Sequence, residues 1–261
     1  MKKTAVFVCL WSWVALANAQ SGTLVVPDWA IPGSPTHKQS PPPADFHRAS
    51  IHDRTPIGIF SAQSDIGAAL IPGSSNFTDG KYTIRSAGYN VWYTRDEFRF
   101  LWNEMKGDVS LAADVAFPDP NGYGDRKAVL IIRQDLEDDS KQVVVALHGL
   151  GMIQLAQRPQ KGALTKDREF RVGGRGRPEG KSPDSLVNDL ARRIGLEKRG
   201  DRFSLYVSLD GEPMTKFGPS IELPFAAPFY VGIGFCSHLP DIVDGAVLSN
   251  VVLANKAGRV R

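Results

Sequence analysis

From Ile51 onward, short apolar runs recur along the chain at fairly even spacing, separated by Gly, Asp, Asn and Pro. Strands of this length with turn residues between them are typical of an all-β sandwich or barrel. A doubly wound α/β fold would need helices between its strands, and only residues 184–192 offer a helical turn. We therefore expect an all-β domain over residues 51–256, built as a two-sheet antiparallel sandwich.

The individual strands can be placed from β-branched and aromatic residues that lie between turn signals. Arg199-Gly200-Asp201 and Asp210-Gly211 supply turns, and His148-Gly149-Leu150-Gly151 connects two further strands. The predicted strands cover residues 81–84, 88–93, 98–102, 109–117, 127–134, 141–148, 152–158, 193–198, 202–209, 229–236 and 246–254.

The first 19 residues have the pattern of a secretory signal peptide. Lys2 and Lys3 precede an apolar run at 5–17, and Ala17-Asn18-Ala19 is a small-x-small cleavage pattern. We expect cleavage after Ala19 and a periplasmic or secreted protein; an uncleaved membrane anchor is the alternative. No later segment is apolar for long enough to span a bilayer.

Residues 20–50 are rich in proline and show no apolar period, which predicts an extended arm or linker. Without the signal peptide the chain keeps one cysteine, Cys236, so no disulfide can form within a monomer. Cys236 lies in an apolar strand pattern, and we expect a buried thiol with no catalytic role.

The formal net charge of +3 falls close to neutral without Lys2 and Lys3, which gives no general attraction to nucleic acid or to a membrane surface. Residues 166–190 are basic and glycine-rich, which predicts a loop. This loop is either a solvated insertion or a binding site for a polyanion.

Alternation within the strands separates a bulky apolar face from a face of small residues. In the strand at 109–117, for example, Leu111, Ala113, Val115 and Phe117 alternate with Ala112, Asp114 and Ala116. The small-residue faces carry isolated polar groups, namely Asp114, His148, Tyr206 and His238. These faces predict a ligand-binding groove. The alternatives are a plain solvent-exposed face and a face covered by the proline-rich arm.

Aromatic residues in the first half of the domain could stack on sugar rings, although Trp92 and Trp102 could equally fill the core. The candidate ligand-binding residues are Asn90, Trp92, Asp114, Arg133, His148, Tyr206 and His238.

Signals for catalysis and metal binding are sparse. Asp135, Glu137 and Asp139 could hold a structural calcium ion, or they form a solvated acidic turn. Asp114 is the only carboxylate that the pattern places on the small-residue face, and glycoside cleavage needs a pair. No catalytic residue is assigned, and no cofactor other than calcium is expected.

Several segments together resemble the exported domains of the DUF1349 type, which belong to the concanavalin A-like lectin/glucanase fold. The resemblance covers about Thr55 to Leu253 and is carried by residues 89–92, 107–111, 126–134, 145–149, 196–201 and 229–234. It implies a jelly-roll sandwich with a concave face. In bacteria, similar domains occur beside periplasmic TolB-like β-propeller repeats. The acid-rich catalytic strand of the glucanases of this fold has no match here.

The sequence therefore predicts an exported, non-catalytic module that binds a polysaccharide or oligosaccharide on its concave sheet face. One alternative is a glycoside-processing enzyme in which Asp96, Glu97 or Glu197 completes a pair with Asp114. Another is an envelope scaffold that binds protein partners through sheet edges and the arm.

Overall fold

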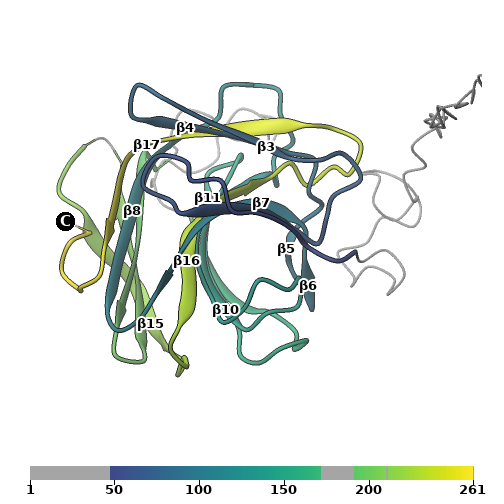
Figure 1. Ribbon diagram of the computed structural model, residues 1–261. Helices are drawn as coiled ribbons and strands as arrows, with labels where there is room; N and C mark the ends of the chain where they lie inside the picture. Colours follow the sequence, from purple (N-terminus) through teal and green to yellow (C-terminus); the bar gives the residue numbers. More distant parts are fainter. Residues whose placement is uncertain (1–47, 172–190, 210, 261) are drawn as a thin grey trace, which may run out of the picture.

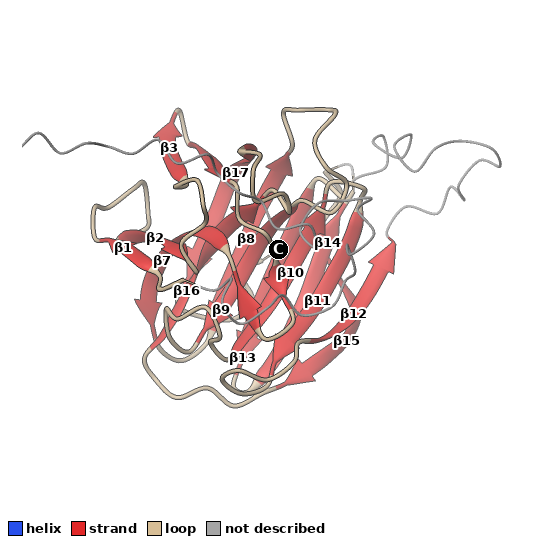
Figure 2. Cartoon of the chain, turned by 90° about the vertical axis from the view of Figure 1, so that its right-hand side faces the viewer, coloured by secondary structure: helices blue, strands red, loops and turns tan. Residues whose placement is uncertain are grey.

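The computed structural model describes residues 48–171, 191–209 and 211–260, and this part of the chain is all-β without a helix (Figures 1 and 2). The predicted signal peptide and nearly all of the predicted arm lie outside the described residues. None of the described residues belongs to a helix long and apolar enough to cross a membrane.

The first sheet has eight strands in the order β1-β2-β7-β16-β9-β10-β11-β12, all antiparallel. In Figure 1 it curves around the side on which the short hairpin β5–β6 lies. Its strands are β1 (Ile51–Asp53), β2 (Ala62–Ile66), β7 (Phe98–Met105), β16 (Phe229–Cys236), β9 (Lys127–Arg133), β10 (Gln142–His148), β11 (Met152–Arg158) and β12 (Lys166–Arg171).

The second sheet has seven strands in the order β15-β14-β13-β8-β17-β4-β3, again antiparallel. Its strands are β15 (Thr215–Glu222), β14 (Arg202–Ser208), β13 (Arg193–Arg199), β8 (Val109–Ala116), β17 (Asp244–Ala254), β4 (Lys81–Ser86) and β3 (Ser74–Thr78). The hairpin pairs β5 (Val91–Trp92) with β6 (Arg95–Asp96).

The main core lies between the two sheets, because each sheet turns its bulky apolar face inward. Leu111 of β8, Leu205 of β14 and Ile233 of β16 are fully buried in it. These are the faces that alternation predicts as apolar. The predicted two-sheet antiparallel sandwich is confirmed.

A second apolar cluster covers the other, concave face of the first sheet. Ile131 of β9, Val144 of β10 and Ala156 of β11 belong to it, and Val91 of the β5–β6 hairpin packs there with them. This concave face is therefore largely filled by side chains and is not an open groove.

Several predicted elements differ from the structure. Residues 88–93 do not form one strand: only Val91 and Trp92 do, and at Gly88 the backbone passes so close to the Glu97 carbonyl that a Cβ would lie 2.1 Å from its oxygen. Residues 166–171 form the edge strand β12 where a loop is predicted, while most of the remaining basic segment lies outside the described residues. The edge strands β3 and β15 escape prediction because most of their side chains are exposed and they lack a continuous apolar face.

Candidate functional site

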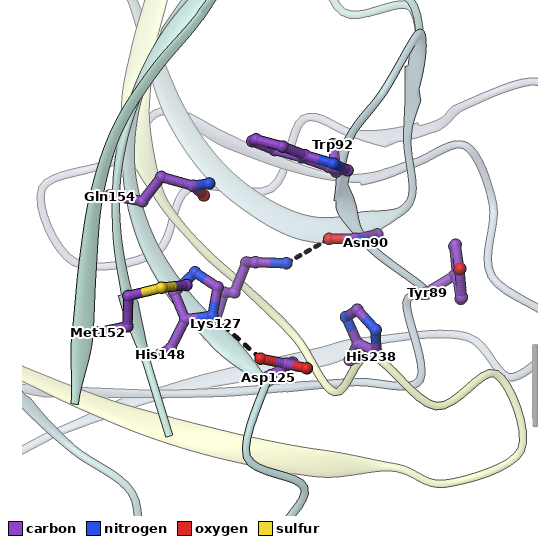
Figure 3. Close-up of a pocket in the computed structure, with 9 residues that line it drawn as sticks. All are labelled: Tyr89, Asn90, Trp92, Asp125, Lys127, His148, Met152, Gln154 and His238. Carbon is purple, nitrogen blue, oxygen red and sulfur yellow. Dashed lines mark hydrogen bonds and ion pairs between the residues drawn. The ribbon is translucent and has the colours of Figure 1, made fainter. Parts of the chain in front are cut away.

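A pocket lies at one end of the concave face, where four strands of the first sheet meet. Antiparallel pairing brings together the start of β9, the end of β10, the start of β11 and the end of β16, so that His148 and Cys236 both lie opposite Lys127. We call this hollow the rim pocket; its cavity volume is about 50 Å³, and about 420 Å³ is free of atoms when the open solvent at its mouth is included (Figure 3). It is lined by Tyr89, Asn90, Trp92, Asp125, Lys127, His148, Met152, Gln154 and His238.

The alternation of the strands aims polar side chains into the rim pocket. Lys127 opens β9 on the concave face, and the same face continues through the apolar Val129 and Ile131. The Lys127 ammonium donates a hydrogen bond to Asn90 Oδ1, from the segment just before β5. Because Asn90 comes from the hairpin side and Lys127 from the sheet, this bond joins the two walls of the pocket.

His148 lies deep in the rim pocket, and it is neutral at physiological pH. Burial removes solvent from the ring and lowers its pKa to about 4, although the Asp125 carboxylate acts in the opposite direction. Nδ1 makes only a long contact of 3.7 Å with Oδ1 of Asp125, and neither ring nitrogen has a hydrogen-bond partner within 3.5 Å. A buried imidazole with both nitrogens unsatisfied is costly unless a ligand or water completes its bonds.

Gln154 presents a second unsatisfied group. Its Nε2 donates to Asp167 Oδ2 at 2.9 Å, which fixes the amide, while the buried Oε1 has no hydrogen-bond partner. In Figure 3 the amide oxygen of Gln154 and the ring of His148 lie on the same wall of the pocket, below and to the side of the Trp92 ring.

Asp125 is the acid of the rim pocket and remains ionised over the whole physiological range. Its pKa is lowered to about 2, first by the adjacent His148 and then by His238 and Lys127. It comes from the loop before β9 and supplies carboxylate oxygens that can accept hydrogen bonds from hydroxyl groups.

His238 is held firmly in place just beyond β16. Its ring lies between those of Tyr89 and Tyr123, at centroid distances of 5.4 and 5.3 Å. Its backbone has a φ of +71°, a left-handed conformation that is uncommon for a residue with a side chain, and its N–H donates to Gly88 O at 3.0 Å. Such local backbone strain is often found at binding sites.

The structure brings four of the seven predicted ligand-binding residues into the rim pocket: Asn90, Trp92, His148 and His238. Trp92 is only partly buried there, whereas Trp102 is buried in the apolar cluster of the concave face and donates to Ser64 Oγ at 3.0 Å. Trp102 thus fills the core, whereas stacking of a sugar on Trp92 stays a prediction.

The placement of Asp114 and Tyr206 with the other candidates is wrong. Both lie on the outer face of the second sheet, on β8 and β14, with the main core between them and the rim pocket. Asp114 accepts hydrogen bonds from Arg193 at 2.7 Å and Asn250 at 2.6 Å, and Tyr206 packs in a small cluster with Met214 and Val260. Alternation sorts the faces of a strand, but it does not tell which sheet the strand joins.

Arg133 is also unavailable to a ligand. It lies at the far end of β9, fully buried, and its Nη1 donates to Asp96 Oδ2 and Gln142 Oε1, each at 2.6 Å. Arg158 of β11, equally buried, binds both oxygens of Asp96 at 2.7 and 2.9 Å and also donates to Trp92 O at 3.2 Å. This buried network fastens the β5–β6 hairpin to the sheet.

Comparison with known proteins gives likeness of fold alone. No family model matches the sequence, and no curated protein sequence matches it. Among solved structures, a functionally unknown protein from Saccharomyces cerevisiae has a TM-score of 0.53 and 15% identity, over 72% of this chain and 95% of that chain.

Two further solved structures are similar to a lesser degree. The carbohydrate-binding module CBM66 from Bacillus subtilis has a TM-score of 0.44 and 15% identity, over 70% of this chain and 91% of that one. A β-glucanase from Bacillus licheniformis has a TM-score of 0.47 and 8% identity, over 80% and 99% of the two chains.

Two of the three predicted calcium ligands converge on a cation of the protein itself, the ammonium group of Lys161. Asp135 and Asp139 both pair with Lys161, at 3.3 and 2.7 Å, and Oδ1 of Asp135 accepts a hydrogen bond from the Glu137 N–H at 3.0 Å. Over residues 48–171, 191–209 and 211–260, no group of three His, Cys, Asp or Glu side chains could hold a metal ion. The solvated acidic turn describes this segment better.

Sequence reasoning missed the roles of Asp125, Lys127 and Gln154. Asp125 lies in a loop, where the sequence has no periodicity that would show which way its side chain points. Lys127 and Gln154 do carry a signal, because each is a polar residue on the concave side of a strand whose neighbours are otherwise apolar.

Proposed function

We propose that the protein is an exported carbohydrate-binding module in which the rim pocket holds one sugar unit of an oligosaccharide or polysaccharide. The observation that carries the proposal is the presence of unsatisfied buried polar groups, the two nitrogens of His148 and Oε1 of Gln154, beside the partly exposed ring of Trp92. Such groups need a partner that both donates and accepts hydrogen bonds, as the hydroxyl groups of a sugar do.

The side chains of the pocket match the two-sided chemistry of a sugar ring. The apolar face of a ring can stack on Trp92, which lies across the pocket from His148 and Asp125 in Figure 3. Hydroxyl groups can then donate to Asp125 and Gln154 and accept from Lys127. Because Lys127 and Asp125 carry opposite charges and His148 is neutral, the pocket favours an uncharged sugar over a polyanion.

A binding role is favoured over glycoside hydrolysis by the supply of carboxyl groups. Hydrolysis by the common mechanisms needs two carboxyl groups flanking one bond. Asp125 is the only acid among the described residues that line the rim pocket. Of the acids considered for a pair with Asp114, Asp96 is held by two arginines and Glu97 is only 4% exposed. Glu197 shares the outer face of the second sheet with Asp114, but it pairs with Ser110, four residues along β8 from Asp114, and its Oε2 accepts from Gly258 N–H.

The remaining parts of the proposal rest on the sequence. The basic, apolar and small-residue pattern of residues 1–19 supports export to the periplasm or the medium. The resemblance to DUF1349-type domains supports the same location, and a scaffold function that uses residues 20–50 stays a prediction.

A glycan-array screen of the chain starting at Gln20 tests the proposal. The expected result is binding to a defined set of neutral saccharides, lost at least tenfold (about 1.4 kcal/mol) in Trp92→Ala and in Gln154→Ala. Asp114→Ala is the matched control, because it removes a carboxylate on the opposite side of the sandwich and should bind as the wild type does. A folded wild-type protein that binds no saccharide, or equal loss in the control, would contradict the proposal.

A further inference from the structure

The centre of the concave face is closed to a ligand. The five small and β-branched side chains at its centre are each at most 1% exposed: Val129, Ile131, Val144, Ala146 and Ala156. Val91 and Trp92 of the β5–β6 hairpin, together with Leu136, pack on the cluster that they form. A glycan chain therefore has no path along the sheet, although the fold would otherwise offer a groove there.

The hairpin that closes this face is a fixed part of the fold. Asp96 of β6 is 0% exposed, as are Arg133 and Arg158, and these arginines come from β9 and β11 beneath it. Moving the hairpin aside would expose the apolar cluster and separate buried opposite charges, which is strongly unfavourable. The closure is thus permanent under native conditions.

The rim pocket has a floor, because the filled part of the concave face begins directly beside its lining residues. Lys127 and His148 are 3% exposed and lie at its inner end, where the filled part of the concave face begins. Trp92 forms one wall, and His238, fixed between Tyr89 and Tyr123, forms another. The edge of a sugar unit can enter the cavity of about 50 Å³, but a chain cannot run through and leave on the other side.

A second hollow continues from the mouth of the rim pocket. It is formed by residues 120–126 with Gly149 and Leu150, and Asp125 lines both hollows. A chain whose last unit occupied the rim pocket would leave past Asp125 over this loop.

We infer that the rim pocket recognises the terminal unit of a neutral glycan chain and not its internal units. This inference rests on the proposed function and deepens it. A pocket with a floor binds chain ends, so the number of binding sites on a linear polysaccharide is set by the number of chains. An open groove would bind internal segments, so the number of binding sites would be set by the total chain length.

Binding capacity measured against chain length tests the inference. The probes are linear polysaccharides, namely amylose, a linear β-1,3-glucan and a linear mannan, each intact and after partial acid hydrolysis that shortens the chains about tenfold. The moles of protein bound per gram at saturation are measured by calorimetric titration or depletion. Terminal recognition predicts about a tenfold rise in capacity on hydrolysis for the glycan that binds, with the affinity per site unchanged.

The outcomes separate the inference from the proposed function. Capacity that stays constant or falls on hydrolysis overturns terminal recognition and leaves saccharide binding standing. Absence of binding to all probes and to the array overturns both. Borohydride reduction then identifies the end: a capacity unchanged by reduction assigns the non-reducing end, a capacity lost assigns the reducing end, and either result supports the inference. Asp114→Ala should follow the wild type throughout.

Discussion

Replacing Asp96 by Asn should destabilise the protein more than almost any other single change of charge. Asp96 is the shared partner of Arg133 and Arg158, with N–O distances of 2.6 and 2.7 Å, and all three side chains are 0% exposed. The two cations hold the pKa of the Asp96 carboxyl below its ordinary value, against the opposing and largest effect of burial. The variant keeps the shape of the side chain but leaves two buried guanidinium groups without a carboxylate.

The size of the effect follows from burial. Removing one partner of a buried ion pair costs about 3–5 kcal/mol, and here two cations lose the same partner. Since a domain is stable by about 5–15 kcal/mol, the variant should lose about a fifth or more of its stability. With a urea dependence of about 2–3 kcal/mol/M, the unfolding midpoint should fall by about 1–2.5 M.

Urea unfolding followed by tryptophan fluorescence measures this loss, with Asp114→Asn as the matched control. The Asp114–Arg193 pair has a similar distance, 2.7 Å, but its side chains are 34% and 22% exposed, so its loss should cost about 0–1 kcal/mol. A loss below about 1 kcal/mol for Asp96→Asn, with an unchanged urea dependence, would refute the idea that this network fastens the hairpin.

Three further predictions concern buried titratable groups. Burial raises the pKa of Glu97 to about 8 from an ordinary 4.5, so the free energy of unfolding should fall as pH rises through this window. Urea titrations should therefore show Glu97→Gln more stable, compared with the wild type, at pH 8 than at pH 5. The same difference between variant and wild type at both pH values would contradict this. The pKa of His148 is lowered to about 4, so the free energy of unfolding should fall as pH drops from 6.5 towards 4. In His148→Gln this dependence of stability on pH should be weaker. The same pH dependence in the variant and the wild type would contradict a buried neutral ring. Burial raises the pKa of the Cys236 thiol to about 11. In a chain starting at Gln20, a disulfide reagent at pH 8 should therefore not react with this thiol until urea unfolds the protein. Rapid reaction with the folded protein would contradict the burial of Cys236.

Strands with a fully buried face could be predicted from the sequence almost to the residue. Residues 152–158 and 229–236 are β11 and β16 as predicted, because every second side chain lies in the main core and apolar residues are required there. The edge strand β15 could not be predicted in this way: it contains Gly218 and Pro219, and most of its side chains face solvent.

The candidate site could be predicted only in part, for a reason of topology. His148 and His238 line the same pocket because β10, which ends at His148, and β16, which ends two residues before His238, both belong to the first sheet. Asp114 shows the same alternation on β8, but β8 pairs within the second sheet, and sheet membership depends on long-range pairing that a local pattern does not contain. The closure of the concave face could not be predicted from the sequence either, because it depends on the β5–β6 hairpin, whose strands have only two residues each.

The rim pocket is tested most directly by following the tryptophan side chains in a ¹H–¹⁵N spectrum during a saccharide titration. The chain starting at Gln20 contains Trp29, Trp92 and Trp102, so three indole signals are expected, and Trp92→Phe assigns the decisive one. With the saccharide that binds best on the array, the Trp92 signal should shift in a saturable way while that of the buried Trp102 stays in place. Saturable binding that leaves the Trp92 signal unmoved would place the sugar elsewhere and contradict the account.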